Sequence, residues 1–239
     1  MGRATRAGGE PVVEEAADSV RLRILRGAAA AFGRKGYGAT SVEVILAEAR
    51  VSRRTFYKVF RSKDDVLRVL FENSVARLLA AVREAEQKPR SARERLTAAV
   101  EAYVQVHARA GPLARVLLLE QFSPNSPLAK QRQTAMTAFT ALLSDAYARE
   151  GRERPDPILA HGVVAAINQI AVQMATEYPT GGWDIERAKR AMLRILVALD
   201  EDAEVRTPIP GLAGDSRPRR RPDRRHRSAP ARRSARTSG

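Results

Sequence analysis

The sequence predicts an all-α fold, and three observations support this class. Apolar residues recur at helical spacing along most of the chain, and no stretch alternates long enough to make a strand. Only 5% of the 239 residues are aromatic, while alanine is abundant, as helical bundles allow. Breakers that contain Pro or Gly divide the chain into segments of helical length.

The N-terminal part predicts four helices that follow a disordered arm at residues 1–17. Each helix begins at a residue whose side chain can accept a hydrogen bond from the first turn. In chain order these candidate caps are Asp18 or Ser19, Thr40 or Ser41, Ser52, and Ser62. The segment 62–65 has the form of a capping box, and the helix that it starts continues to about Glu86.

The C-terminal part predicts five further helices and a disordered tail. The expected helices cover residues 92–109, 112–122, 126–150, 156–177 and 184–203, separated by Pro- and Gly-containing breakers. From 206 to 239 the composition changes to Arg, Pro, Ser and Ala, which cannot build a core. We therefore expect the last folded residues near position 205.

The charge is large but unevenly placed. The net charge is +15, and residues 206–239 hold eleven Arg and two Asp, which leaves +6 for the rest of the chain. This balance fits a nucleic-acid partner, although a solvated tail that binds nothing would raise the isoelectric point equally well.

The absence of cysteine excludes disulfides, thiolate catalysis, Cys-ligated zinc and iron–sulfur clusters. The N-terminus is acidic and has no apolar run, so we expect no secretory signal and a cytoplasmic location. The uncharged stretch 157–176 approaches the length of a membrane span, but its polar residues favour a buried or intersubunit helix over membrane association. These polar residues are His161, Asn168, Gln169 and Gln173.

Residues 40–63 are the most informative segment, with two short helices and a tight turn. On the second helix, apolar side chains lie opposite a cationic face that carries Arg53, Arg54, Tyr57, Lys58 and Arg61. A small helix of this kind suits the major groove of DNA. Taken alone, an Arg pair is in most cases a solvated surface, but the preceding helix, the tight turn and the apolar backing favour DNA binding.

The residues in this segment predict two kinds of DNA contact. Arg53, Arg54 and Thr55 are the expected base readers, because Arg can grip guanine with two hydrogen bonds and Thr can meet a base or a thymine methyl. Phosphate contacts are expected from polar side chains and from helix starts. They involve Thr40, Ser41, Ser52, Tyr57, Lys58 and Lys63.

A series of short motifs runs through residues 20–71. It comprises Ala31-Phe32, Gly36-Tyr37, Thr40-Ser41-Val42, Ile45, Ala49-Arg50-Val51-Ser52, Phe56-Tyr57-Lys58-Val59-Phe60 and Ser62-Lys63-Asp64. This series resembles the DNA-binding domain of the TetR family of transcriptional regulators. The resemblance implies a helix-turn-helix DNA-binding domain at 18–63. It also implies a helical effector-binding and dimerisation domain at 64–205, in a homodimer.

Three residues depart from the family pattern. Arg50 stands in place of the usual turn glycine, and it costs on the order of 1 kcal/mol if the turn requires a positive φ. Alternatively, the turn has another geometry or Arg50 adds a phosphate contact. Leu46 replaces a small residue, and Val59 replaces a histidine.

The resemblance also implies a small-molecule pocket among the helices between 92 and 177. Candidate lining residues are Tyr103, His107, Phe122, Met136, Phe139, Asn168, Gln169, Gln173 and Trp183. Each has a plainer alternative as a core, surface or loop residue, and the three amides could instead lie in the dimer interface. Because the residues of this region are mostly apolar and few are aromatic, a hydrophobic or amphipathic effector is favoured over a highly charged one. The last two helices are expected to pair with their copies in the dimer.

Two functions follow from these features. The first is a ligand-responsive homodimeric repressor on a near-palindromic operator. The second is a nonspecific architectural nucleic-acid-binding protein that uses the Arg-rich tail. Three scattered histidines and the absence of catalytic motifs predict neither an enzyme nor a bound metal or cofactor.

Overall fold

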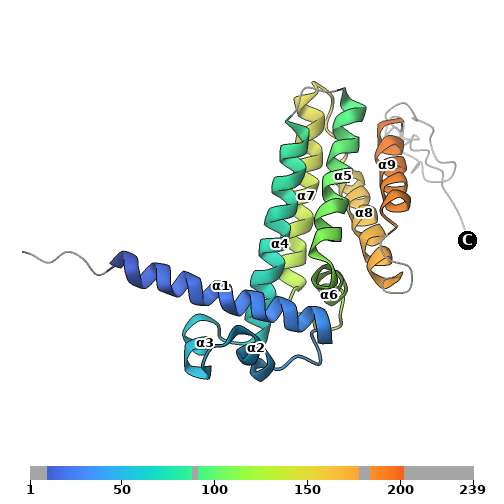
Figure 1. The fold of residues 1–239 in the computed structure, drawn as a ribbon. Coiled ribbons are helices and arrows are strands. Elements are labelled where there is room, and N and C mark those ends of the chain that lie inside the picture. Colours follow the sequence, from blue (N-terminus) through green and yellow to red (C-terminus); the bar gives the residue numbers. More distant parts are fainter. Residues whose placement is uncertain (1–9, 88–90, 178–183, 202–239) are drawn as a thin grey trace, which may run out of the picture. The chain divides into compact units, whose positions relative to one another are not determined.

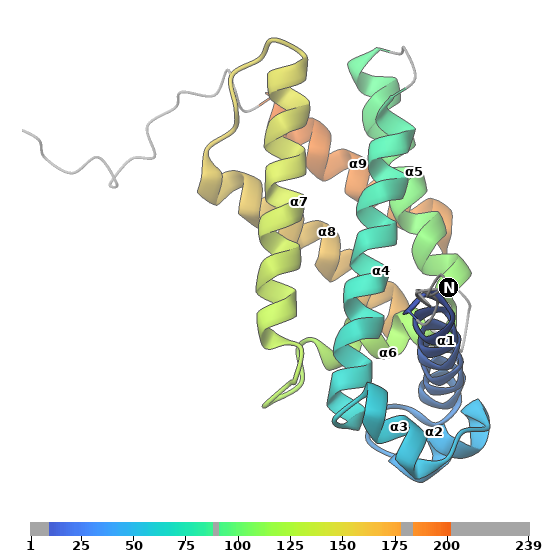
Figure 2. The ribbon, with the colours of Figure 1, turned by 90° about the vertical axis from the view of Figure 1, so that its left-hand side faces the viewer.

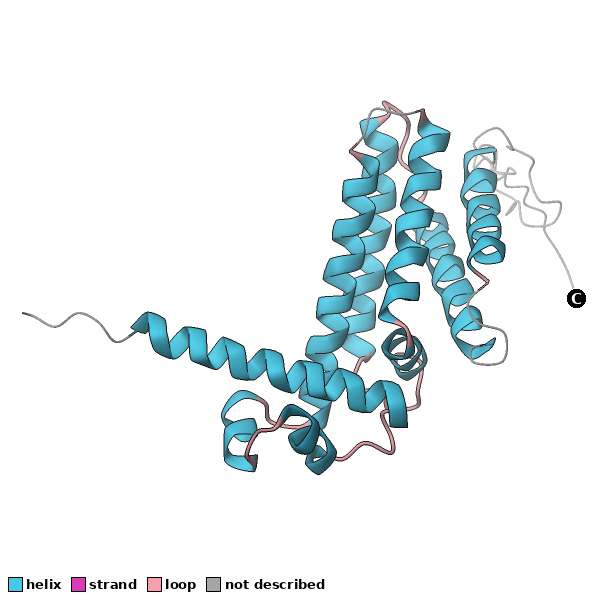
Figure 3. Cartoon of the chain, viewed as in Figure 1, coloured by secondary structure: helices cyan, strands magenta, loops and turns pink. Residues whose placement is uncertain are grey.

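The computed structural model describes residues 10–87, 91–177 and 184–201, and every regular element in these ranges is a helix (Figures 1 and 3). The helices are α1 (Glu10–Lys35), α2 (Val42–Ala49), α3 (Arg53–Val59), α4 (Lys63–Glu86), α5 (Ala92–Ala110), α6 (Pro112–Glu120), α7 (Ala129–Arg149), α8 (Pro157–Glu177) and α9 (Ile185–Glu201). The predicted all-α class is confirmed. The predicted tail at 206–239 and the first nine residues of the predicted arm lie outside the described residues.

The first helix starts earlier than the sequence predicts. It begins at Glu10 and not at Asp18 or Ser19, so residues 10–17 are helical where an arm was expected. Pro11 is compatible with this start, since the first turn of a helix needs no amide donor at that position.

The predicted serine caps hold the next three helices. Ser41, and not Thr40, accepts from the Val44 amide (3.4 Å). Ser52 accepts from Thr55 at 3.1 Å, and Ser62 accepts from Asp65 at 3.2 Å. The box predicted at 62–65 is only half formed, because the Asp65 carboxylate accepts from the Arg61 amide instead of closing on Ser62.

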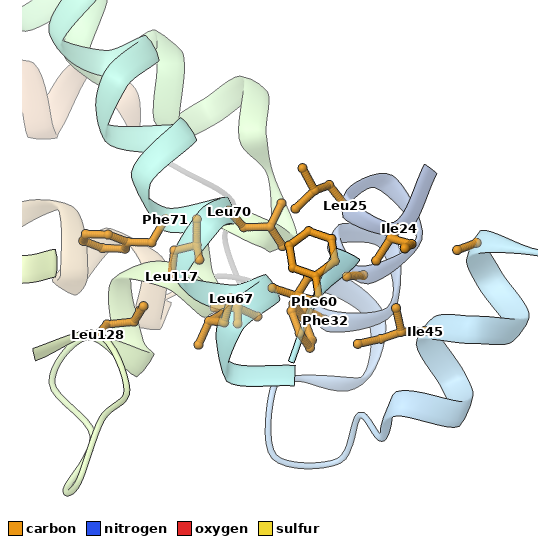
Figure 4. Close-up of a cluster of buried hydrophobic side chains, with 14 of the residues drawn as sticks. Ile24, Leu25, Phe32, Ile45, Phe60, Leu67, Leu70, Phe71, Leu117 and Leu128 are labelled. Carbon is orange, nitrogen blue, oxygen red and sulfur yellow. The ribbon is translucent and has the colours of Figure 1, made fainter. Parts of the chain in front are cut away.

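The N-terminal helices share a core with α4, α6 and α7. Figure 1 shows α1 lying across the lower end of α4, with α2 and α3 beneath it. In Figure 4, Leu67 and Leu70 of α4 lie between the side chains of α1 and α2 and those of Phe71, Leu117 and Leu128. The core of the three N-terminal helices is therefore completed by the rest of the chain.

Gly27 sets how closely α1 and α2 approach each other. A Cβ atom at this position would lie 2.7 Å from the Ala49 backbone nitrogen, which is inside van der Waals contact. Leu46 of α2 is partly buried against the same core.

The remaining helices form a second core. Figure 2 shows α4, α5 and α7 running side by side, with α8 and α9 behind them. Val104 of α5, Met174 of α8 and Met192 of α9 are each less than 9% exposed in this second cluster. Within the described residues, α8 alone is long and apolar enough to cross a membrane. Of its apolar stretch Pro157–Thr176, 39% is buried inside the protein.

Candidate nucleic-acid interface and ligand cavity

Helix α3 separates an apolar back from an exposed front. Phe56 and the following Phe60 are 0% and 1% exposed, and they anchor α3 to the core. Arg53, Arg54 and Lys58 are exposed, as is Tyr57 at 49%. The face that the sequence assigns to the major groove is therefore the face that α3 presents to solvent.

The three predicted base readers differ in how they are held. Arg53 forms an exposed ion pair with Glu43 of α2. The Thr55 hydroxyl lies 2.8 Å from Ser52 Oγ, and either oxygen can donate. Among the described residues, Arg54 has no hydrogen-bonding or charged partner, so its five donors are all available to a ligand.

The start of α4 is tied to the loop between α1 and α2. The Tyr37 hydroxyl donates to Asp64, and Lys63 Nζ donates to the Tyr37 carbonyl at 3.0 Å. The Lys63 ammonium also lies 4.3 Å from the Tyr37 ring centroid. Burial and the Asp64 hydrogen bond raise the pKa of Tyr37, so the phenol stays protonated. Lys63 retains two further donors for a phosphate.

Thr40 is not available for the predicted phosphate contact. Its side chain is 1% exposed, and its hydroxyl donates to the Gly36 carbonyl at 2.7 Å. Because α2 begins after Ser41, the helix start belongs to Ser41 and Val42. The Thr40 side-chain assignment is therefore wrong: this hydroxyl holds the loop before α2.

The turn between α2 and α3 requires a left-handed residue at Arg50. Its φ and ψ are 52° and 49°, and its amide donates to the Ala47 and Leu46 carbonyls. Of the alternatives that the sequence leaves open, the structure therefore shows the positive-φ turn with an exposed arginine in the usual glycine position.

An apolar cavity of about 150 Å³ lies in the C-terminal domain and is lined by residues of all six helices from α4 to α9. Its walls include Phe71, Val75, Leu78 and Val82 of α4, together with Val100, Leu118, Leu142 and Val164. Tyr103, His107, Met136, Phe139 and Asn168 line it, so five of the predicted lining residues come together. The rings of Tyr103 and His107 are in contact, with centroids 4.6 Å apart and their planes tilted by 42°.

Burial favours the neutral forms of two polar groups that line this cavity. It raises the pKa of the Tyr103 phenol and lowers the pKa of the His107 imidazole. His107 Nδ1 lies 3.0 Å from the Tyr103 carbonyl oxygen, one turn earlier on α5. The middle of the cavity therefore offers uncharged hydrogen-bonding groups within an apolar wall.

Three predicted lining residues lie outside this cavity. Phe122 is 47% exposed, with the Arg132 guanidinium 5.1 Å from its ring centroid. Gln169 and Gln173 are exposed on α8, since they fall on the face opposite its buried residues. Trp183 lies outside the described residues.

The cavity also has polar lining residues that the sequence reading missed. They are Ser74, Glu86, Gln121 and Arg132. Glu86 was detectable, because it continues the helical spacing of the apolar residues 71, 75, 78 and 82 on α4. An acid at the next position of an apolar stripe indicates a charged end to the cavity. Arg132 has no such periodic signal.

Comparisons with known proteins agree with this arrangement. The pattern of the family described as "Bacterial regulatory proteins, tetR family" matches residues 24–70. The HTH-type transcriptional activator FasR of Mycolicibacterium smegmatis is 28% identical over 133 residues, which is 56% of this chain. The match spans 61% of FasR, less than two thirds of that relative.

Solved structures of similar fold extend the likeness beyond the N-terminal domain. A tetR-family regulatory protein from Rhodococcus RHA1 is 27% identical, with a TM-score of 0.56, and the match covers 74% of this chain and 96% of that one. FadR from Bacillus subtilis, in complex with stearoyl-CoA, has a TM-score of 0.64 at 20% identity, over 74% and 97% of the two chains. Residues 24–70 therefore match the DNA-binding domain of the tetR family of bacterial regulatory proteins, and the fold of the described residues resembles that of tetR-family regulators.

Proposed function

We propose that the protein is a cytoplasmic, ligand-responsive homodimeric repressor that binds a near-palindromic operator through α3. The observation that carries the DNA assignment is the exposed face of Arg54, Tyr57 and Lys58, fixed from behind by the buried Phe56 and Phe60. A dimer would present two such helices to half-sites one helical turn apart or a multiple of it.

Selection of bound sequences from a random DNA pool tests base reading. Arg54→Ala should relax the preference at one base pair of each half-site, a loss of about 1–3 kcal/mol in discrimination. The matched control is Arg77→Ala, an exposed arginine well along α4, which should leave the selected sequence unchanged. An unaltered sequence preference in Arg54→Ala would remove α3 from base reading.

The competing function is a nonspecific binder that depends on the Arg-rich tail. Deletion of residues 206–239 should leave operator preference intact and make the salt dependence of binding shallower. Collapse of all DNA binding in this deletion would favour the architectural protein instead.

The dimer proposal rests on an exposed stripe along α8. Ile158 is 83% exposed, and Gly162, Ala165, Gln169 and Gln173 follow it on the same face. Small residues and an uncovered Ile on one helical face favour close packing against another helix. Gln169 and Gln173 would then lie in the interface, which was the alternative to a ligand contact.

Gly162 offers a direct test of this interface. A Cβ atom there meets nothing within 4 Å in the protomer, so Gly162→Leu should leave the protomer folded. In a tight interface between copies, the same side chain should push the helices apart and yield a monomer by analytical ultracentrifugation. Thr134→Leu, exposed on α7, serves as the control and should remain dimeric.

The shape of the cavity points to an effector with a long alkyl chain. Because a helix rises about 1.5 Å per residue, the lining residues from Phe71 to Glu86 extend over roughly 22 Å of α4. Apolar side chains line the cavity along this length, which makes it a candidate channel for an extended alkyl chain. The FadR complex with stearoyl-CoA shows that a regulator of this fold can hold such a ligand.

Calorimetry with a series of alkyl ligands tests this effector class. Each buried methylene contributes about 0.8 kcal/mol, so affinity should rise roughly fourfold per added carbon until the channel is full. Ala99→Phe should obstruct the cavity, and Ala80→Phe, exposed on α4, is its control. Affinity that does not depend on chain length would contradict an alkyl effector.

The cavity and the N-terminal core share part of their walls. Phe71, Leu117 and Ala135 line the cavity and also belong to the cluster that holds α1–α4 together. A ligand that displaces these side chains can therefore favour a different setting of the recognition helices.

The direction of regulation is a separate question, because FasR is an activator by name. Transcription in vitro from a promoter with the selected operator should fall on addition of the protein and recover with ligand. A rise on addition of the protein would instead establish activation.

A further inference from the structure

A second, charged hollow of about 200 Å³ adjoins the apolar cavity. The two share three lining residues, Glu86, Leu96 and Ala146, at the C-terminal end of α4, the N-terminal end of α5 and the C-terminal end of α7. The remaining lining residues of this charged hollow are Arg95, Tyr147, Arg149, Glu150 and Arg152. One end of the alkyl channel therefore meets a cluster of arginines.

Cations outnumber anions in the charged hollow. Arg149 pairs with Glu86, and Arg95 reaches Glu150 Oε1 from Nε at 3.0 Å and from Nη2 at 2.8 Å. Arg152 Nη1 is 4.0 Å from the other Glu150 oxygen, and its guanidinium carbon lies 4.4 Å from the Tyr147 ring centroid. Among the described residues that line the hollow, three arginines thus face two carboxylates, an excess of one positive charge.

Glu86 stands at the junction of the two hollows, with a side chain only 13% exposed and paired with Arg149. The pKa of its carboxyl is raised by burial, against the opposing effect of Arg149. A guanidinium stays charged at any physiological pH, and its planar donors match the two oxygens of a carboxylate or a phosphate. The hollow therefore favours an anion over a cation or a neutral group.

We propose that the charged hollow binds the anionic head group, a carboxylate or a phosphate, of an amphipathic effector whose alkyl chain occupies the apolar cavity. This assignment rests on the proposed function of the cavity. Arg152, whose guanidinium carbon lies 4.4 Å from the Tyr147 ring centroid, is the principal head-group ligand. Leu96 and Ala146 form the passage between head and chain, where no polar side chain other than Glu86 stands.

The wild-type protein tests the head group without any substitution. Calorimetry compares palmitate, hexadecyl phosphate and 1-hexadecanol below their aggregation concentrations. Since hydrogen bonds to charged groups are the strong ones, at least one anion should bind roughly ten- to hundredfold more tightly than the alcohol. The stronger of the two anions identifies the head group.

Failure of this assignment can be told from failure of the alkyl cavity. Equal binding of the alcohol and both anions would overturn the head-group site and leave the cavity intact. No binding of any of the three would overturn both.

Substitution of Arg152 places the site within the protein. Arg152→Gln should lose most of the preference for the anion and bind 1-hexadecanol as the wild type does. The control is Arg154→Gln, because Arg154 pairs with Asp145 at 3.3 Å and lines neither hollow. Equal weakening of anion and alcohol in a folded Arg152→Gln would show a structural role and overturn the assignment.

Arg132 supplies the opposite control. It lines the other end of the apolar cavity, and its buried Nε has no partner. Loss of the anion preference in Arg132→Gln, with retention in Arg152→Gln, would place the head group at that end and overturn the proposal.

Discussion

Arg50 offers the sharpest test of how the helix-turn-helix is built, because its backbone lies at φ 52° in a turn that glycine would adopt freely. A left-handed conformation costs an L-residue about 1–2 kcal/mol. Glycine avoids this strain but loses about 0.5–1 kcal/mol more conformational entropy on folding than alanine does. Arg50→Gly should therefore stabilise the protein by about 1 kcal/mol relative to Arg50→Ala.

The comparison of Gly with Ala isolates the backbone, since both variants remove the exposed guanidinium and only one removes the Cβ. A gain of about 1 kcal/mol corresponds to a rise of about 2–4 °C in Tm for a protein of this size. Thermal unfolding followed by circular dichroism measures it. An Arg50→Gly protein no more stable than Arg50→Ala would refute the strain argument.

The same pair of variants tests whether Arg50 contacts a DNA phosphate. If Arg50 contacts a phosphate, both variants should bind every DNA sequence more weakly and lower the salt slope by about one. If the guanidinium stays in solvent, DNA affinity and the salt slope should be the same in both variants as in the wild type. The stability and salt-slope measurements are independent, so the two roles of this residue can be assigned separately.

Two further predictions concern buried positions. Gly27→Ala should destabilise the protein by up to about 2 kcal/mol, because overpacking against the Ala49 backbone outweighs the helix propensity gained. Chemical denaturation measures this change. Gly38→Ala is the control, because a Cβ atom at Gly38 meets nothing within 4 Å. Burial lowers the pKa of His107, so the unfolded chain binds its proton more readily and stability should fall as the pH drops below about 6.5. His107→Gln should lose less stability than the wild type between pH 7 and 5, and equal losses in the two proteins would exclude His107 as the cause.

Features set by local chemistry could be predicted from the sequence. Ser52 and Ser62 were identified as caps because a cap requires only one oxygen and the next turn. The buried back of α3 followed from helical spacing alone. Tyr103 and His107 both line the cavity because they lie one turn apart on one face of α5, and their contact with a ligand stays a prediction.

Features that depend on how helices meet could not be predicted in this way. Thr40 is a good cap by its chemistry, but the approach of α1 buries it. Phe122 is apolar enough for a cavity wall, yet α6 ends before it and leaves the ring in solvent beside Arg132. The charged hollow brings together residues from α5 and from the C-terminal end of α7 that are more than fifty positions apart, so no local sequence pattern predicts it.

The sharing of one core by α1–α4, α6 and α7 limits how this protein can be engineered. A chimera that takes α1–α3 from this chain and the remainder from another regulator would face Phe32 and Ile45 with foreign side chains at the positions of Leu67, Leu70 and Leu117. Transplanting the operator preference alone should instead require exchange of the exposed front of α3, with every buried residue behind it left in place.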